Sequence, residues 1–151
     1  MKYLTQEAYD SGNWQKACDR LDKAFKKIKK YFPEAFLEEF LEGDFHDCTI
    51  VSMKFNREDN DSTNLNIKMI DGYENGVYHY LTIKKITNIK MNMNIGCSVW
   101  LYAEILPIKK EKYIDGKRFS LEIAFPYIVS PDDKSLYVEF GSIAYEKKSN
   151  L

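Results

Sequence analysis

The sequence has no long apolar run and few cysteines, and each of these absences excludes a class of protein. No stretch approaches the roughly 20 apolar residues that span a bilayer, and the polar N-terminus lacks the apolar core of a signal peptide. Three cysteines without close spacing, at positions 18, 48 and 97, make a poor disulfide framework. These features predict a reduced, cytoplasmic protein with no membrane partner.

The chain also has little net charge. Its 22 basic and 23 acidic residues leave a formal net charge of −1. Proteins that bind nucleic acids usually carry a clear basic excess, so the balance argues against DNA or RNA as a partner. The sequence lacks a P-loop, a glycine-rich dinucleotide turn, a serine elbow and a Cys-x-x-Cys pair. We therefore predict no cofactor.

Glycine and proline are scarce as well, with 7 and 4 residues respectively. No segment is rich enough in either to act as a linker, so residues 1–151 are expected to form a single domain. Within it, the apolar pattern changes at Gly43. The change predicts a helical layer over 1–43 and an antiparallel sheet over 44–151.

Before Gly43, apolar residues recur every three or four positions, as on helices. One stripe runs from Trp14 to Tyr31. A second follows Pro33, which fits the first position of a new helix. Gly43 is the expected left-handed end of that second helix.

After Asp47, apolar residues recur at every second position, which is typical of half-buried strands. Consecutive strands with short turns pair as antiparallel neighbours. The pattern therefore predicts an α+β fold, with the N-terminal helices packed on one face of a mostly antiparallel sheet of about six or seven strands.

The junction reads Phe45-His46-Asp47-Cys48, the one place where His, Asp and Cys are consecutive. In a catalytic interpretation Asp47 orients His46 as a general base, or both residues bind a metal. Neighbours on an extended chain point to opposite faces, so this dyad requires a turn. The interpretation that the sequence favours is local: Asp47 caps a turn, His46 bonds to backbone and Phe45 fills the core.

His79 is the only other histidine. It alternates in step with Val77, Leu81 and Ile83, which places it on an apolar strand face. It is the candidate third member of a site with His46 and Asp47, either for hydrolysis or for metal binding. A mononuclear metal site usually takes three or four ligands, and no spacing in the sequence supplies the remainder. The sequence therefore predicts no metal, and the cysteines are expected to be packing residues.

Aromatic residues at expected outward positions supply the positive argument for binding. Tyr78, Tyr80, Trp100 and Tyr102 form the predicted contact patch for a protein partner, because aromatic anchors dominate interface energetics. The alternative is ordinary sheet packing. A flat edge strand, at 65–69 or 89–95, would also permit a homodimer.

Three segments carry a resemblance to a known group: Met-Lys-Tyr-Leu-Thr-Gln-Glu-Ala-Tyr at 1–9, Phe-His-Asp at 45–47 and Trp-Leu-Tyr-Ala-Glu-Ile at 100–105. In them the chain resembles uncharacterised bacterial proteins classed as a domain of unknown function. The resemblance implies no established activity and no catalytic residues. In size and class the chain is also similar to small cytoplasmic immunity-type proteins.

Two functions follow as hypotheses. The leading one is a non-catalytic protein-binding module of the bacterial cytoplasm, of the immunity-type inhibitor kind. The alternative is a small hydrolase-like or metal-binding enzyme with its site at His46, Asp47 and His79.

Overall fold

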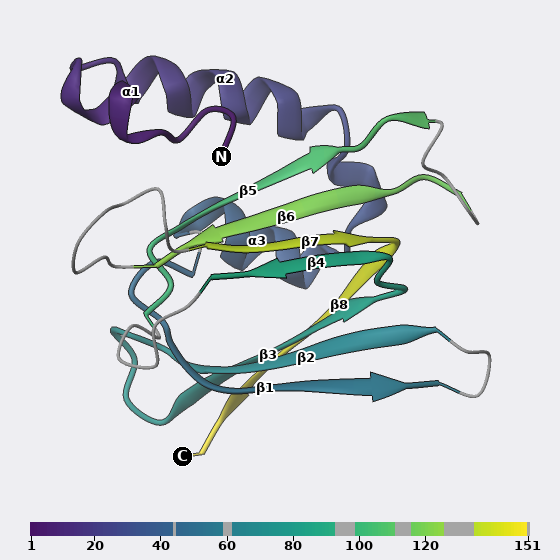
Figure 1. Cartoon of the computed structure of the whole chain (residues 1–151). Coiled ribbons are helices and arrows are strands. Elements are labelled where there is room, and N and C mark those ends of the chain that lie inside the picture. The colour runs from purple at the N-terminus through teal and green to yellow at the C-terminus, as the bar shows by residue number, and fades with distance from the viewer. Residues whose placement is uncertain (44, 59–61, 93–98, 111–115, 126–134, 151) are drawn as a thin grey trace.

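Helices come first and strands second in this chain (Figure 1). The structure is a computed structural model that describes residues 1–43, 45–58, 62–92, 99–110, 116–125 and 135–150. Three α-helices, with a 3-10 turn at Lys29–Tyr31 between the second and third, precede the strands: α1 (Gln6–Asp10), α2 (Trp14–Lys26) and α3 (Glu34–Glu42). Eight antiparallel strands follow in the described ranges: β1 (Thr49–Arg57), β2 (Thr63–Ile70), β3 (Val77–Lys84), β4 (Asn88–Met91), β5 (Tyr102–Pro107), β6 (Phe119–Ala124), β7 (Ser135–Phe140) and β8 (Ser142–Ser149). The predicted α+β class is confirmed.

Local chemistry explains where the helices begin and end. The Thr5 hydroxyl accepts a hydrogen bond from the backbone N–H of Ala8 and so caps α1. Phe32 is extended because Pro33 follows it, and this separates the 3-10 turn from α3. Gly43 does follow α3, but its φ of −146° is not left-handed, so that detail of the prediction is wrong. The chain instead takes left-handed conformations at Phe45 and Asp47, with φ of 52° and 66°.

The strands form two sheets of four rather than one larger sheet. The first sheet has the order β1-β2-β3-β8, and the second has the order β4-β7-β6-β5. The meander of β1, β2 and β3 ends at Lys85, where a φ of 58° turns the chain away, and β4 then pairs with β7. Return to the first sheet comes through Gly141, which joins β7 directly to β8.

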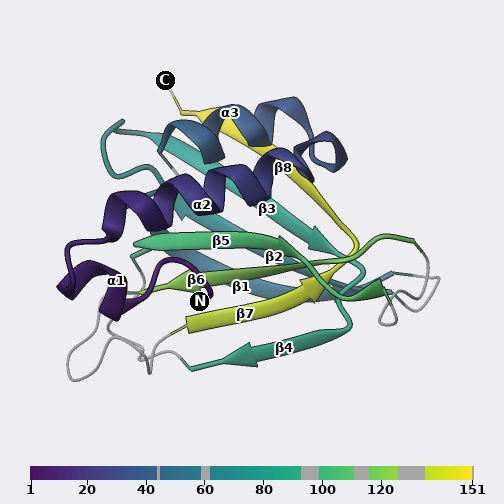
Figure 2. The same cartoon turned by 90° about the horizontal axis from the view of Figure 1, so that it is seen from above.

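The core lies between the sheets and beneath the helices. Both sheets and the helices contribute to one apolar cluster, in which Phe36 of α3, Leu81 of β3 and Phe140 of β7 are almost completely buried. Seen from above, α2 runs alongside β5 and α3 lies over β8, so each helix covers an edge strand of a different sheet (Figure 2). Burial of these aromatic and aliphatic side chains is the main source of stability.

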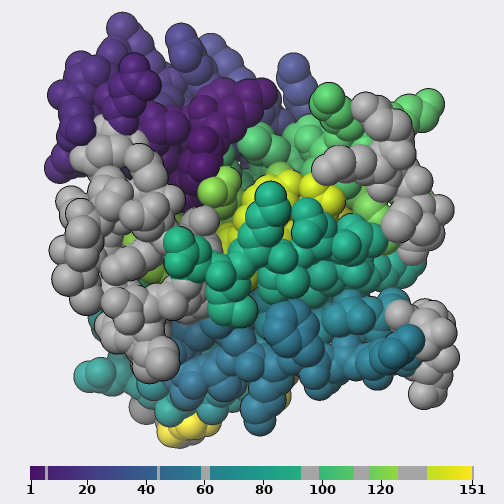
Figure 3. All heavy atoms as spheres, viewed as in Figure 1, coloured from purple at the N-terminus to yellow at the C-terminus, as the bar shows by residue number. Residues whose placement is uncertain are grey.

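The outer surface follows from this arrangement. In the space-filling view helices α1 and α2 and strands β1 and β2 lie at opposite ends, with strands of the second sheet between them (Figure 3). The predicted edge at 65–69 is wrong, because β2 is paired on both sides, whereas β4 is an edge strand. None of the helices in the described ranges is long and apolar enough to cross a membrane.

Candidate functional site

The junction between helices and strands folds into a tight loop, residues 45–48, which we call the seam loop. The N–H of His46 donates to the Gly43 carbonyl at 2.7 Å, and the N–H of Cys48 donates to the Phe45 carbonyl at 3.0 Å. Backbone bonds also tie the loop to Trp100, since the N–H of Asp47 donates to the Trp100 carbonyl and the N–H of Trp100 donates to the Cys48 carbonyl, each at 2.8 Å. The seam loop is therefore a fixed turn and not an extended segment.

A second turn, residues 71–76 between β2 and β3, packs against the seam loop. We call it the hairpin turn. Asp71 Oδ1 accepts hydrogen bonds from the N–H groups of Tyr73 and Glu74, each at 2.7 Å, as in an Asx turn. At Gly72 a Cβ atom would lie 2.6 Å from the Asp47 carbonyl oxygen, so only glycine permits this approach of the two backbones.

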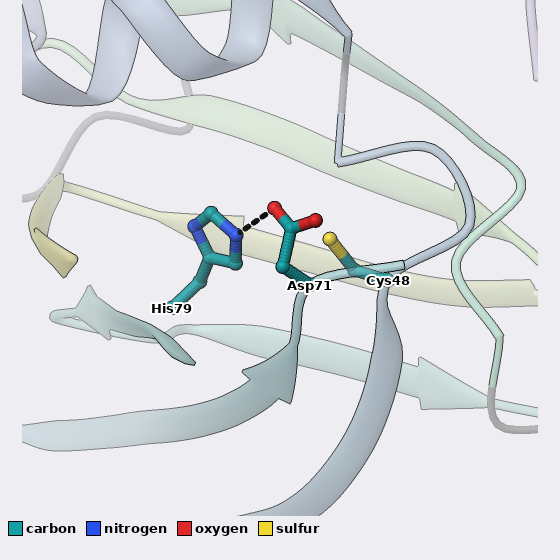
Figure 4. Close-up of side chains that lie close together, drawn as sticks. All are labelled: Cys48, Asp71 and His79. Atoms are coloured by element: carbon teal, nitrogen blue, oxygen red, sulfur yellow. Dashed lines mark hydrogen bonds and ion pairs between the residues drawn. The ribbon is translucent and has the colours of Figure 1, made fainter. Parts of the chain in front are cut away.

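Three side chains with metal-binding chemistry meet where the two turns touch. Cys48, Asp71 and His79 point toward one another, and their ligand atoms all lie within 4.8 Å (Figure 4). The Nε2 atom of His79 is 2.8 Å from Asp71 Oδ2. Cys48 and His79 are buried, with 3% and 1% of their surface exposed, whereas Asp71 is partly exposed. We call these three residues the Cys–Asp–His cluster.

The second nitrogen of His79 has a partner as well. Its Nδ1 atom lies 2.7 Å from the hydroxyl of Tyr145, which comes from β8. An ionised Asp71 can only accept, so a neutral His79 donates from Nε2 to Asp71 and accepts at Nδ1 from Tyr145. A hydroxyl can donate or accept, and Tyr145 therefore fits either tautomer of the ring.

The pKa values of Asp71 and Cys48 are shifted in opposite directions. Burial alone would raise the pKa of Asp71, but hydrogen bonds from the N–H of Glu74, from His79 and from the N–H of Tyr73 outweigh it and lower that pKa. Burial raises the pKa of the Cys48 thiol to about 11. Cys48 is thus protonated at neutral pH and is not prepared to act as a nucleophile. Cys18 is half-buried, and Cys97 lies outside the described residues.

The His46–Asp47 pair that the catalytic interpretation requires lies within hydrogen-bonding distance, because the seam loop supplies the turn that it needs. His46 Nδ1 is 2.9 Å from Asp47 Oδ2. The Tyr73 hydroxyl donates to the same carboxylate oxygen at 2.6 Å, and this hydrogen bond is the main cause of the lowered pKa of Asp47. Both side chains of the dyad are partly exposed.

One cavity brings the two predicted histidines onto a shared surface. It has a volume of about 410 Å³, and His46, His79 and both turns line it. The histidines pair with different carboxylates, Asp47 and Asp71, so the predicted trio is not one hydrogen-bonded group. Three glutamates, Glu39, Glu42 and Glu74, also line the cavity. Lys147 of β8 pairs with Glu39 at 3.0 Å and lies 3.6 Å from Glu74, so the three carboxylates outnumber this one cation and the wall stays acidic.

Asp71 and Cys48 are the site residues that sequence reasoning missed. The hairpin register held part of the signal. Met69 pairs with His79, and Asp71 follows Met69 by two positions on the same side of β2, so Asp71 is a diagonal neighbour of His79. No strand register predicts that Cys48 lies beside His79, because the position of Cys48 depends on the contact between the two turns.

The predicted aromatic patch is dispersed. Trp100 is completely buried, since its backbone bonds to the seam loop carry it into the core, and it cannot contact a partner. Tyr78 and Tyr80 lie half-buried on the outer face of β3, beneath the amino group of Lys68. Tyr102 belongs to the second sheet, where its ring centroid is 4.9 Å from that of Trp14. Only Tyr78 and Tyr80 therefore share a surface.

Comparison with known proteins gives one match. A family described as proteins of unknown function, DUF4085, matches residues 5–118. The chain belongs to the DUF4085 family. The resemblance to a domain of unknown function is thereby confirmed. No curated protein and no solved structure is significantly similar to the chain.

The match locates the site within this DUF4085 protein. All three members of the Cys–Asp–His cluster, together with His46 and Asp47, fall inside the matched range. Tyr145, the hydroxyl partner of His79, lies beyond it on β8. The family description assigns no activity, so a function has to be argued from the site itself.

Proposed function

We propose that this protein binds a divalent transition-metal ion of the zinc class through Cys48 Sγ, Asp71 Oδ2 and His79 Nε2. The observation that carries the proposal is the convergence of one ligand atom from each of these three residues within 4.8 Å of one another. The sequence predicted no metal, and the trio of its alternative hypothesis differs from this set, because Cys48 and Asp71 stand in place of His46 and Asp47.

The chemistry of the ligands supports zinc. Thiolate, imidazole and carboxylate are the three side-chain groups that zinc takes in proteins. A thiolate and a carboxylate together carry two negative charges, which match a divalent cation. Burial keeps Cys48 protonated without metal, and a bound cation supplies the charge that stabilises its thiolate.

The geometry requires only small movements. Ligands at zinc bond lengths in a tetrahedral site are separated by about 3.3–3.8 Å. The 2.8 Å contact between His79 and Asp71 must therefore open slightly, and the thiol must move by no more than about 1.5 Å. Asp71 Oδ1 stays anchored by the hairpin turn while Oδ2 turns to the metal, and Tyr145 accepts the Nδ1 proton that the metal-binding tautomer of His79 carries.

Three protein ligands leave the fourth position of a tetrahedral ion open to water or substrate. The acidic cavity beside the cluster supports this arrangement, because its glutamates attract cations. His46 lines the same cavity and is hydrogen-bonded to Asp47, so it is the base that we propose for the alternative function, metal-assisted hydrolysis.

The other functional predictions from the sequence stay predictions. A reducing cytoplasm, which the cysteine count predicts, would keep the Cys48 thiol available for metal. Protein binding and an immunity-type role now depend on Tyr78 and Tyr80 in place of the original four aromatic residues.

Cobalt(II) titration of the chelator-treated protein tests the proposal. Binding at the cluster is expected to give a thiolate-to-cobalt charge-transfer band in the near ultraviolet and the visible bands of a tetrahedral ion, both removed by one equivalent of zinc. Isothermal titration is expected to give one zinc per chain.

Three variants and one control decide which residues bind. Cys48→Ser should abolish the charge-transfer band, and Asp71→Asn and His79→Gln should each weaken zinc binding by more than about 100-fold. Cys18→Ser is the matched control and should bind as the wild type does. A charge-transfer band that survives Cys48→Ser, or the absence of any band in the wild type, would overturn the proposal.

A further inference from the structure

A second cavity lies on the helix side of the molecule and takes no part in the Cys–Asp–His cluster. Its volume is about 380 Å³, and α2, α3 and the start of β5 line it. Small-molecule sites in proteins commonly have volumes of about 300–1,000 Å³. We call it the helix-side cavity. It meets the acidic cavity only at the residues that end α3 and at His46.

Most of its wall is apolar and aromatic. Leu21 and Phe25 come from α2, and Trp14 stands at the start of the same helix. Three rings from three separate segments follow one another along the wall. The Trp14 and Tyr102 centroids are 4.9 Å apart, and the Tyr102 and His46 centroids are 5.4 Å apart. Burial raises the pKa of Tyr102, so its ring stays neutral and electron-rich on its faces.

Only negative side chains supply fixed charge to this wall. Asp22 of α2 and Glu42 of α3 line the cavity, and no lysine or arginine does among the described residues. Both carboxylates are exposed, and in the described part of the chain neither forms an ion pair or a side-chain hydrogen bond. An apolar cavity bordered by two unpaired carboxylates is complementary to a cation that carries an apolar body.

We propose that the helix-side cavity binds a small organic ammonium ion with an aromatic or aliphatic body. The body would occupy the apolar wall beside Leu21 and Phe25. The ammonium group would lie at the carboxylates of Asp22 and Glu42. The rings of Trp14 and Tyr102 would extend the apolar wall for the body, since Trp14 is eight residues, about 12 Å of helix, before Asp22. A bare metal ion fits less well, because among the described residues the potential ligands of this wall, Cys18, Asp22, Glu42 and His46, do not converge as those of the Cys–Asp–His cluster do.

Three probes with one shared body test the charge preference: phenethylammonium, 2-phenylethanol and phenylacetate. Their affinities are measured by titration followed in amide NMR spectra, with the cluster free of metal. We expect the ammonium ion to bind about tenfold more tightly than the alcohol, and the anion to bind most weakly. Added salt should reduce the difference in affinity between the ammonium ion and the alcohol, because exposed charges are screened.

Variants assign the preference to the cavity. Glu42→Gln and Asp22→Asn should each weaken ammonium binding by about threefold and leave alcohol binding unchanged. Glu38→Gln is the matched control, since Glu38 is an exposed residue of α3 that does not line the cavity. All three exchanges are isosteric and lie at exposed positions, so the fold should persist.

Two outcomes would overturn the proposal. Equal affinity for the ammonium ion and the alcohol would mean that the cavity recognises only the apolar body and not the charge. An equal loss in Glu38→Gln would mean that general surface charge attracts the probe. Neither outcome bears on zinc binding, because Cys48, Asp71 and His79 do not line this cavity.

Discussion

Replacing Gly72 with alanine is expected to push the seam loop and the hairpin turn apart. The new Cβ would lie 2.6 Å from the carbonyl oxygen of Asp47 and 2.9 Å from its carbonyl carbon. Overpacking of this kind costs about 1–3 kcal/mol. The atoms that the methyl group meets are backbone atoms that cannot rotate away, so we expect about 2–3 kcal/mol of lost stability, a fall in Tm of about 5–10 °C.

Two other glycines provide controls for Gly72→Ala. A Cβ at Gly43 meets nothing within 4 Å, and its φ of −146° is not left-handed, so Gly43→Ala should change stability by less than about 0.5 kcal/mol. Gly76 also has open space but a φ of 77°, and Gly76→Ala should cost about 1 kcal/mol from backbone strain alone.

Chemical denaturation of the three variants measures their free energies of unfolding, in which Gly72→Ala should lose most, Gly76→Ala less and Gly43→Ala least. Zinc titration adds a second readout. Cys48 follows Asp47 and Asp71 precedes Gly72, so Gly72→Ala should also weaken zinc binding by at least about tenfold, whereas Gly76→Ala should not. The reasoning would be refuted if Gly72→Ala were no more destabilising than Gly76→Ala. Full stability loss with unchanged zinc affinity would count against the proposed metal site alone.

Three further predictions follow from buried contacts. The carboxylate of Glu104 accepts hydrogen bonds from the backbone N–H groups of Lys2, Tyr3 and Leu4. Glu104→Gln should therefore lower the free energy of unfolding in urea by about 2–4 kcal/mol and speed hydrogen exchange at those amides. A loss below about 0.5 kcal/mol would contradict this. Phe36 is completely buried among aromatic rings, and Phe36→Ala should cost about 3–5 kcal/mol, measured in the same way; a cost below about 1 kcal/mol would mean that the helix does not depend on this contact. Zinc binding near pH 7 should release about one proton, because the Cys48 thiol, whose pKa is about 11, must ionise; titrations in buffers of different ionisation enthalpy measure the number, and zero would exclude a thiolate ligand.

Much of the fold was predictable because its signals are local. The change of period at Gly43 separates helices from strands, and the extended residue before Pro33 divides the helical part. The alternation of apolar and polar residues along β3 correctly placed His79 on the buried face. The number of sheets was not predictable in this way. It depends on Lys85, whose left-handed conformation sends β4 to pair with β7, and nothing in the alternation of neighbouring residues marks that turn.

The candidate site was predictable only in part, for the same reason. His46 and Asp47 are adjacent in sequence, and their pairing needed only a turn. Cys48, Asp71 and Tyr145 come from three distant segments, and their meeting depends on the backbone contact at Gly72 and on β8 lying beside β3. Contacts of that kind are decided by tertiary packing, which periodicity does not record.

The place of β8 beside β3 has a consequence for how this chain is made. Lys84 pairs with Ser142, so the first sheet closes only after four intervening strands have been synthesised. Until then β3 presents an unpaired edge, and a nascent chain with an open strand edge is vulnerable to pairing with a neighbour. Folding through such distant pairings is slow, because the loop-closure entropy is lost before the contacts form. The interval between the emergence of β3 and the arrival of β8 is therefore the period in which this protein most needs protection from aggregation.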